Sequence, residues 1–399
     1  MRRALLLLAV LNTLNYLDRM VFSAVAPHLQ SDLNLSNGQI GTLMSAFMVG
    51  YIAFSPIFGY LGDRWHKPKL MAAGLIAFSL ATVATAYAST FWMLLIARIM
   101  VGVGEASFVI IAPAYIGERA PNEVSANRAL AIFYAALPLG TALGYAAGGL
   151  LGSRVGWQSV FIIAGLPGLL LILPTLNLHE EPMDTTIPAI NLPDFFRSMG
   201  NLLSSRPYMR TLIGYCAAVF AGGGFSFWAT SFGVKVLRAD LQTVNYGLGA
   251  VVLGSAVAGT VIGGKFGTRM VRPNFVVGGL TRFGAIMAFL SFPFCLAAIQ
   301  ATSLAVFFGA LFVSMMFFFA AMSPVNLALL KAAPNHLGAT AMAVSNLAVH
   351  ACGDVFSTAL IGILADSFPL QMVMGVLPFF LIIAGFAWWG KNSRQYSAS

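Results

Sequence analysis

Five ionisable side chains lie inside long apolar stretches of the sequence: Asp18, Arg19, Arg98, Glu105 and Asp354. A charge at the middle of a bilayer costs roughly 2.5–3.5 kcal/mol on insertion scales, so a charge retained there is a functional candidate. Arg98 and Glu105 are seven residues apart, about two helical turns, so both project from one face of a helix. An arginine that moves relative to a carboxyl group changes the protonation of that group. We therefore expect Asp18 and Glu105 to couple protons, with Arg19 and Arg98 as their charge partners.

These residues also have structural interpretations. The first four charges would alternatively form a permanent salt-bridge network that joins two helices, and both roles can coexist. His350 lies four residues before Asp354, which favours a hydrogen-bonded helix contact over a proton relay. Arg282 lies near the end of an apolar run, which favours a side chain that snorkels to the membrane surface over one that contacts phosphate.

The elements that must carry these charges are membrane-spanning helices. Hydrophobic residues make up 59% of the 399 residues and charged residues 9%, against about 45–50% and 25% in an ordinary soluble domain. Since a spanning helix uses about 20 apolar residues, the apolar runs predict twelve spans. In order, they are roughly 4–28, 38–62, 69–88, 91–115, 127–152, 157–177, 209–233, 243–266, 274–298, 302–329, 336–363 and 369–390. The pattern excludes a large soluble domain and predicts an all-α membrane protein with twelve transmembrane helices in two pseudo-symmetric six-helix bundles.

Lysine and arginine set the orientation of these spans. The formal net charge is +9, but the basic residues are spread through short loops, which excludes a surface that follows a nucleic-acid backbone. If the N-terminus is cytoplasmic, sixteen of the 22 Lys and Arg lie on the cytoplasmic side, three lie outside and three lie within spans. This asymmetry follows the positive-inside rule. We expect a multi-pass protein of the cell membrane, or of the inner membrane in a Gram-negative cell, with both termini in the cytoplasm.

One polar stretch divides the chain into two halves of six spans. The expected domains are an N-terminal six-helix bundle at 1–177, a cytoplasmic linker at 178–208, and a C-terminal six-helix bundle with a short tail at 209–399. Apolar residues at helical spacing between 192 and 203 predict a short helix in the linker. That helix is expected either on the cytoplasmic membrane face or in a water-exposed amphipathic linker.

An internal repeat supports this division. Residues 59–64 read GYLGDR at the end of the second span, and residues 264–269 read GKFGTR at the end of the eighth, with Thr268 in the place of Asp63. Two similar bundles that rock about a central site suit transport by alternating access.

Two motifs resemble those of the major facilitator superfamily. Residues 59–69, GYLGDRWHKPK, resemble its loop motif, which implies that Asp63 and Arg64 belong to a cytoplasmic gate; a basic loop that anchors the chain at the surface is the alternative. Residues 140–149, GTALGYAAGG, resemble its antiporter signature, with Tyr145 in the place of proline. Small residues four apart also form a ridge for close helix contact, and plain packing is the favoured interpretation of this motif.

A narrower resemblance links three segments to the spinster family of lipid transporters. They are NYLDR at 15–19, the stretch from Arg98 through GVGEASF at 102–108 to Pro113, and HACGD at 350–354. Spinster proteins export lysophospholipids or sphingosine-1-phosphate, so the resemblance implies a substrate of that kind. Its anionic headgroup would meet Arg19 and Arg98. By analogy with the superfamily, the cavity-lining residues are Tyr16, Phe108, Tyr115, Phe133, Tyr134, Phe227, Trp228, Asn326, His350 and Asp354.

The motifs of enzymes are missing or incomplete in this sequence. Residues 259–265 match GxxxxGK, but Phe266 follows where a phosphate-binding loop needs Ser or Thr, and no strand precedes the motif. The three cysteines and five histidines are dispersed and form no zinc-ligand or disulfide pattern. We expect no catalytic residue, metal or cofactor.

Taken together, these patterns predict a proton-coupled secondary transporter that exports anionic amphiphiles by alternating access, acting as a monomer. Its expected partners are an amphiphilic small-molecule substrate, protons and membrane lipids, and no nucleic acid. The alternative function is a general facilitator-superfamily exporter of drugs or small organic anions. A non-transporting sensor is a further class, which flux into liposomes distinguishes because a sensor binds without moving its ligand.

Overall fold

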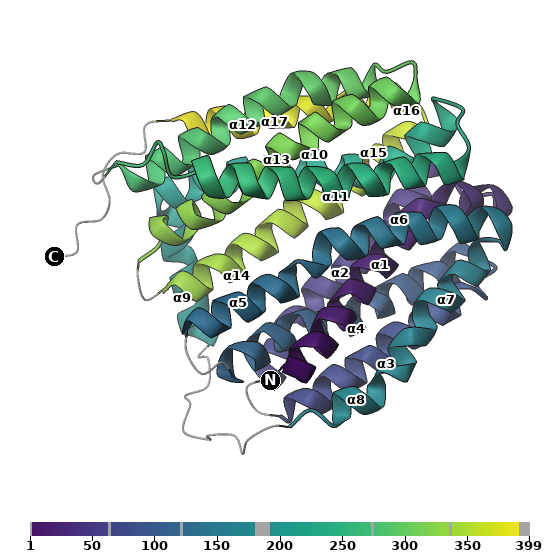
Figure 1. Cartoon of the computed structure of the whole chain (residues 1–399), viewed down its shortest axis with the longest axis horizontal. Helices are drawn as coiled ribbons and strands as arrows, with labels where there is room; N and C mark the ends of the chain where they lie inside the picture. The colour runs from purple at the N-terminus through teal and green to yellow at the C-terminus, as the bar shows by residue number, and fades with distance from the viewer. Residues whose placement is uncertain are drawn as a thin grey trace. The chain divides into compact units, whose positions relative to one another are not determined.

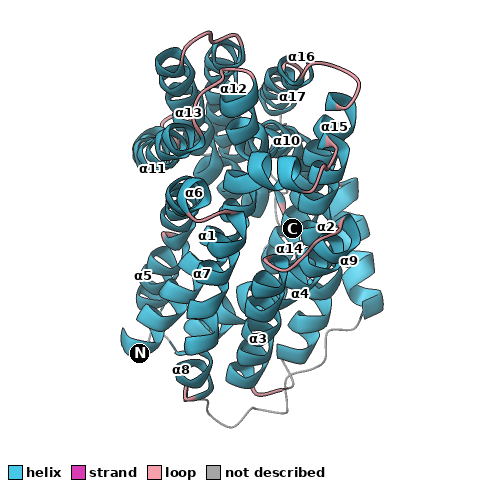
Figure 2. Cartoon of the chain, turned by 90° about the vertical axis from the view of Figure 1, so that its right-hand side faces the viewer, coloured by secondary structure: helices cyan, strands magenta, loops and turns pink. Residues whose placement is uncertain are grey.

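Long apolar helices make up the structure. The computed structural model describes residues 2–62, 65–119, 123–179, 192–272, 275–334 and 337–390. All regular structure in these ranges is helical, without a strand (Figure 2). Twelve helical segments are long and apolar enough to cross a membrane, from Arg2–Asp32 to Leu370–Trp389. The predicted fold class and all twelve predicted spans are confirmed, with ends that differ by a few residues at most.

The described chain forms two compact units. Unit 1 comprises residues 1–188 together with 233–250. Its helices, drawn mainly in purple and blue in Figure 1, are α1 (Arg2–Asp32), α2 (Asn37–Gly62), α3 (Lys67–Thr85), α4 (Phe91–Arg119), α5 (Glu123–Tyr134), α6 (Ala136–Arg154), α7 (Trp157–Leu170) and α8 (Ile172–Leu176).

Unit 2 comprises residues 189–232 and 251–399. Its helices are α9 (Leu192–Ser204), α10 (Arg206–Lys235), α11 (Leu241–Phe266), α12 (Val276–Ile299), α13 (Leu304–Ala332), α14 (Gly338–Val349), the π-helix η2 (His350–Val355), α15 (Phe356–Ala365), α16 (Leu370–Met374) and α17 (Leu377–Trp389). The end of α10 and the start of α11 belong to unit 1.

Three of the spans are broken, and each break lies four residues before a proline. Proline removes the hydrogen bond to the carbonyl group four residues earlier, and its ring clashes with that carbonyl. α5 ends at Tyr134, four residues before Pro138, and α7 ends at Leu170, four residues before Pro174. α16 likewise ends four residues before Pro378. The helix pairs α5–α6, α7–α8 and α16–α17 are therefore single spans interrupted by one local feature of the sequence.

Glycines on α6 bring α1 into close contact. The two helices run side by side in unit 1 (Figure 1). A Cβ atom at Gly144 would lie 2.5 Å from the Leu17 carbonyl oxygen, and one at Gly140 would lie 2.4 Å from the Thr13 carbonyl oxygen, whereas Gly148 faces the Ala24 side chain. Small residues at a four-residue spacing allow such backbone contact. These α6 glycines therefore pack against the part of α1 that carries Asp18 and Arg19. This agrees with the packing interpretation of the glycine motif at 140–149.

Residues 233–250 are attached to unit 1 by polar contacts. The Asn245 side-chain amide donates a hydrogen bond of 2.9 Å to the Ala24 carbonyl oxygen. Lys235 Nζ donates to Gln30 and, at 2.9 Å, to Asn37 Oδ1. The sequence repeat assigns residues 233–250 to the second bundle. In the structure, the same residues belong to unit 1.

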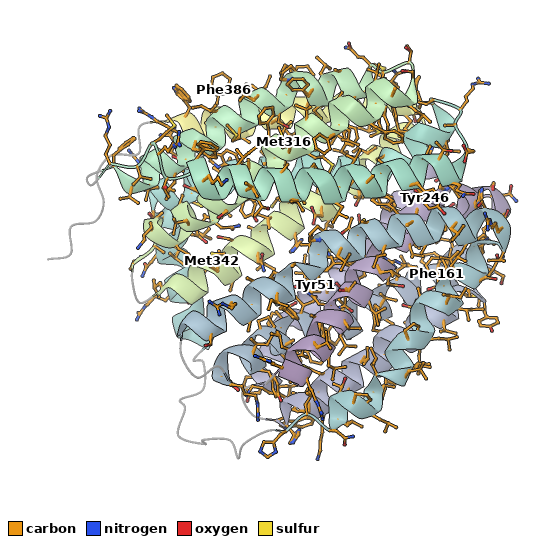
Figure 3. The ribbon with its side chains drawn as sticks, viewed as in Figure 1. Tyr51, Phe161, Tyr246, Met316, Met342 and Phe386 are labelled. Atoms are coloured by element: carbon orange, nitrogen blue, oxygen red, sulfur yellow. The ribbon has the colours of Figure 1, made fainter. Side chains whose placement is uncertain are left out.

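In unit 2, α9 packs against the start of α10 and against α14. Its Leu202 is buried in a cluster with Tyr208, Leu212 and Leu329, and Met199 packs at the edge of that cluster. The short helix predicted in the linker is therefore present, and its apolar residues Met199 and Leu202 contact protein. Other apolar side chains of the unit, such as Phe386 on α17, point outward (Figure 3).

We expect Gly144→Leu to destabilise the protein, because the new side chain overlaps the Leu17 carbonyl group and the Met20 side chain. Overpacking of this kind costs about 1–3 kcal/mol. Thermal unfolding in detergent should show a melting temperature several degrees lower. Gly309→Leu is the matched control, since no atom lies within 4 Å of a Cβ atom at that position. Equal losses in the two variants would contradict a close α1–α6 contact.

Candidate functional site

Two helices of unit 1 bring together the four charges singled out in the first bundle. Asp18 and Arg19 are neighbours on α1, and Arg98 and Glu105 lie two turns apart on α4. The pairs cross between the helices. Arg19 Nη2 lies 2.6 Å from Glu105 Oε1, and Arg98 Nη1 lies 3.8 Å from Asp18 Oδ2. Each helix therefore supplies one acid and one base to the other.

The two ion pairs differ in burial and in hydrogen bonding. The side chains of Asp18, Arg98 and Glu105 are each 1% exposed, whereas that of Arg19 is 13% exposed. Arg19 and Glu105 form a charge-assisted hydrogen bond, the stronger kind. Neither carboxyl oxygen of Asp18 has a hydrogen-bond partner among the described residues. Asp18 is thus held chiefly by charge attraction to Arg98.

Aromatic rings enclose the two guanidinium groups. The ring of Phe47 on α2 lies 5.0 Å from Arg19 Cζ and 4.8 Å from Arg98 Cζ. Arg98 also lies 4.5 Å from the ring of Phe22, and Arg19 lies 5.2 Å from that of Tyr16. Such rings attract a cation through the negative potential of their faces. The site therefore combines four charges with an apolar wall.

Close approach of α2 to α4 positions Phe47. A Cβ atom at Gly102 on α4 would overlap the Phe47 carbonyl group and lie 2.9 Å from the Tyr51 backbone nitrogen. Tyr51, labelled in Figure 3, is itself buried on α2. Sequence analysis missed Phe47, because nothing distinguishes this phenylalanine from the many others in apolar runs. The signal that could have found it is Gly102, a glycine one turn from Arg98 on the same helix.

A second polar cluster lies in unit 2. His350 Nδ1 lies 2.9 Å from Asp354 Oδ2, and both residues belong to η2. π-Helical turns of this kind are frequent at functional sites. The Asp354 carboxylate faces the backbone of α10 at Gly223, and Asn326 on α13 is hydrogen-bonded to Tyr215 of α10. The histidine makes the helix contact that its spacing predicts, and a relay role stays a prediction.

The structure places the other predicted cavity residues in different surroundings. Phe108 and Phe133 are buried in unit 1 with ring centroids 5.9 Å apart, whereas Tyr134 is exposed. Tyr115 is buried near the end of α4, and its hydroxyl group donates a 2.8 Å hydrogen bond to the His179 carbonyl oxygen. In unit 2, Phe227 and Trp228 are buried, and Trp228 donates a hydrogen bond to the Thr358 carbonyl oxygen. Whether these residues line a transport cavity stays a prediction.

The predicted gate residues Asp63 and Arg64 lie outside the described residues. Their neighbour in the loop motif, Lys67, forms an ion pair of 3.1 Å with Glu118 at the end of α4. The lysine of this motif thus connects α3 to α4. No group of three or more His, Cys, Asp or Glu residues that could hold a metal ion occurs within the described ranges.

Comparisons with known proteins agree with this architecture. The sequence profile of the Major Facilitator Superfamily matches residues 8–355. The chain is 30% identical to the "probable sphingolipid transporter spinster homolog 2" of Arabidopsis thaliana, over 97% of this chain and 86% of that protein. The chain belongs to the spinster family of the major facilitator superfamily. It is also 28% identical to human "protein spinster homolog 1", over 91% of this chain and 73% of the human protein.

Solved structures share the fold of this spinster-family protein. The crystal structure of a bacterial homologue of the human lysosomal transporter Spinster, inward-facing and occupied, matches with a TM-score of 0.84 and 19% identity over 99% of this chain and 98% of that chain. A D-xylose–proton symporter matches with a TM-score of 0.74 and 18% identity over 99% and 98% of the two chains. The chain is a multi-pass membrane transporter for a small-molecule substrate, and its relatives are transporters and not enzymes.

Arg19→Gln and Glu105→Gln should each lower the thermal stability of this spinster-family protein. Each change leaves a charge buried without its partner, which costs about 3–5 kcal/mol. The double variant should lose less than the sum of the single losses, because it removes both charges. Melting temperatures in detergent measure this coupling. Lys67→Gln and Glu118→Gln are the comparison cycle, since the Glu118 carboxylate is 57% exposed although Lys67 is 8% exposed, and water around one partner weakens an ion pair. Similar coupling in the two cycles would contradict a buried pair.

Proposed function

We propose that this spinster-family protein is a proton-coupled secondary transporter that exports anionic amphiphiles, such as lysophospholipids or sphingosine-1-phosphate, by alternating access. The crossed, buried ion pairs between α1 and α4 carry this proposal. Charges inside apolar spans are costly and are retained where they act on ions or substrates. Asp18 and Glu105 are each neutralised by an arginine. At each of these two carboxyl groups, a bound proton can take over this neutralisation when the arginine moves away.

Proton coupling follows from the cost of an unpaired buried charge. While Arg19 contacts Glu105, the carboxylate is neutralised within the protein. If Arg19 turns toward another anion, Glu105 takes up a proton, because an isolated carboxylate in an apolar site is strongly disfavoured. The same exchange applies to Asp18 and Arg98, where the contact is longer and the carboxyl oxygens have no hydrogen-bond partner among the described residues. A permanent structural network is the competing interpretation.

The substrate class follows from the same residues. Arg19 is the more exposed of the two arginines, so it is the one placed to meet a phosphate headgroup, and phosphate then competes with Glu105 for its guanidinium group. The rings of Tyr16 and Phe47 beside Arg19 suit the apolar part of an amphiphile. The name of the Arabidopsis relative, a probable sphingolipid transporter, supports an amphiphilic substrate. Drugs or small organic anions are the alternative.

We further propose the orientation and the gate that the sequence predicts. The surplus of Lys and Arg on one side of the spans supports a cell-membrane protein with both termini in the cytoplasm. Asp63 and Arg64 then belong to the cytoplasmic gate that opens and closes as the bundles rock. A monomer suffices for this cycle, because one chain supplies both bundles.

We expect Asp18→Asn and Glu105→Gln to abolish the response of transport to a pH gradient, because neither side chain can then exchange a proton. In proteoliposomes, the gradient-driven rate of lysolipid flux should fall at least about tenfold. A factor of ten corresponds to a loss of about 1.4 kcal/mol. Exchange without a gradient should continue.

Asp240→Asn is the control for this experiment. Asp240 lies outside the spans, and hydrogen bonds from the Thr243 hydroxyl and backbone N–H groups lower the pKa of its carboxyl group. The carboxyl group therefore stays ionised at neutral pH, and the variant should keep the gradient response. If both test variants keep the response to the pH gradient, the ion pairs do not couple protons. They would then form a permanent structural network.

We expect affinity to rise with the tail length of the substrate. Burial of a chain is worth about 0.8 kcal/mol per methylene, so each two added methylenes should strengthen binding roughly tenfold until the site is filled. Binding of lysophosphatidate with different tails to purified protein measures this series. Arg19→Gln should weaken binding of lysophosphatidate more than that of a monoacylglycerol with the same tail. Equal affinity for glycerophosphate and long-chain lysophosphatidate would favour the small-anion alternative.

A further inference from the structure

A basic cavity lies at the junction of α11 and α12 in unit 2. It has a volume of about 480 Å³ and is lined by Arg269, Met270, Arg272, Phe275 and Arg282. Three of the five described residues that line it are arginines. None of these residues belongs to the crossed ion pairs, and the cavity lies wholly within unit 2.

No acidic side chain within the described ranges forms an ion pair with these arginines. The residues of unit 2 include only three acidic side chains, Asp194, Asp354 and Asp366. Part of this shortage of acidic residues comes from the second copy of the loop motif. In that copy Thr268 precedes the arginine, whereas the first copy has an aspartate at this position. The cavity therefore concentrates positive charge that no carboxylate of the described chain neutralises.

Aromatic side chains orient two of the arginines. Arg282 Cζ lies 4.9 Å from the Phe275 ring centroid, and Arg269 Cζ lies 4.3 Å from that of Phe266. The Nε atom of Arg282 is buried and has no hydrogen-bond partner among the described residues. A guanidinium group held over a ring keeps its N–H edge available for an anion, and that edge matches two oxygens of a phosphate group.

We propose that this cavity binds the phosphate headgroup of an anionic membrane lipid that is not the transported substrate. Phosphate explains the three arginines, and a lipid explains their apolar neighbours, because Met270 and Phe266 expose large apolar side chains beside them. The cavity lies at the ends of two membrane-spanning helices, where basic pockets recognise anionic headgroups. A bound lipid would neutralise the arginines and hold the junction of α11 and α12.

The test compares lipid binding by purified, delipidated protein with that of two variants. Arg272→Gln and the double variant Arg269→Gln/Arg272→Gln change exposed side chains, so the fold should be retained. Native mass spectrometry with dioleoyl phosphatidylglycerol should show about fivefold weaker binding for each arginine lost. Arg206→Gln is the matched control, since Arg206 is exposed at the start of α10 and does not line the cavity. It should change binding less than twofold.

Two further probes identify the ligand. Dioleoyl phosphatidylcholine has the same tails without net charge, and glycerophosphate has the phosphate without tails; both should bind at least tenfold more weakly than phosphatidylglycerol. Glycerophosphate binding as tight as that of the lipid would show a site for free phosphate and overturn the lipid assignment. An equal loss in Arg206→Gln and Arg272→Gln would show a general surface attraction and overturn the site.

Discussion

The structure of unit 1 depends on one constraint, which is that a charge in an apolar interior needs a partner. Asp18 and Arg19 on α1 cannot be neutralised by their own helix, and the same is true of Arg98 and Glu105 on α4. The crossed pairs therefore require a particular rotation of α1 against α4 and a particular position along it. The glycine ridge of α6 and the ring of Phe47 on α2 support these two helices from the outside.

The two units use charge differently. In unit 1, acids and bases meet inside the spans and neutralise each other. In unit 2, the polar cluster is the partly exposed His350–Asp354 pair on a π-helix, and the arginines gather at the end of α11 and the start of α12. The repeated loop motif reflects this difference, with Asp63 in one copy and Thr268 in the other. We propose that similar folds in the two halves support proton exchange in one and lipid anchoring in the other.

Backbone hydrogen bonding explains why the helices were easier to predict than the site. In an apolar environment every backbone group must be satisfied, so each long apolar run forms a helix whatever its neighbours are. The interruptions after Tyr134, Leu170 and Met374 each lie four residues before a proline, although other prolines, such as Pro113 and Pro324, lie within unbroken helices. The π-helix at residues 350–355 has no such signal in the sequence, and in the structure its Gly353 packs closely against Val219 and Phe220 of α10.

The sequence by itself determined the twelve spans, the repeat and the identities of the buried charges, because hydropathy and the cost of a buried ion are local properties. Only the tertiary structure decided which charges pair. Sequence neighbours such as Asp18 and Arg19 lie on one helix, yet their partners are Arg98 and Glu105, about eighty residues away. Pairing depends on the rotation of one helix against another, which glycine contacts and aromatic packing set together, and no single stretch of sequence contains that information.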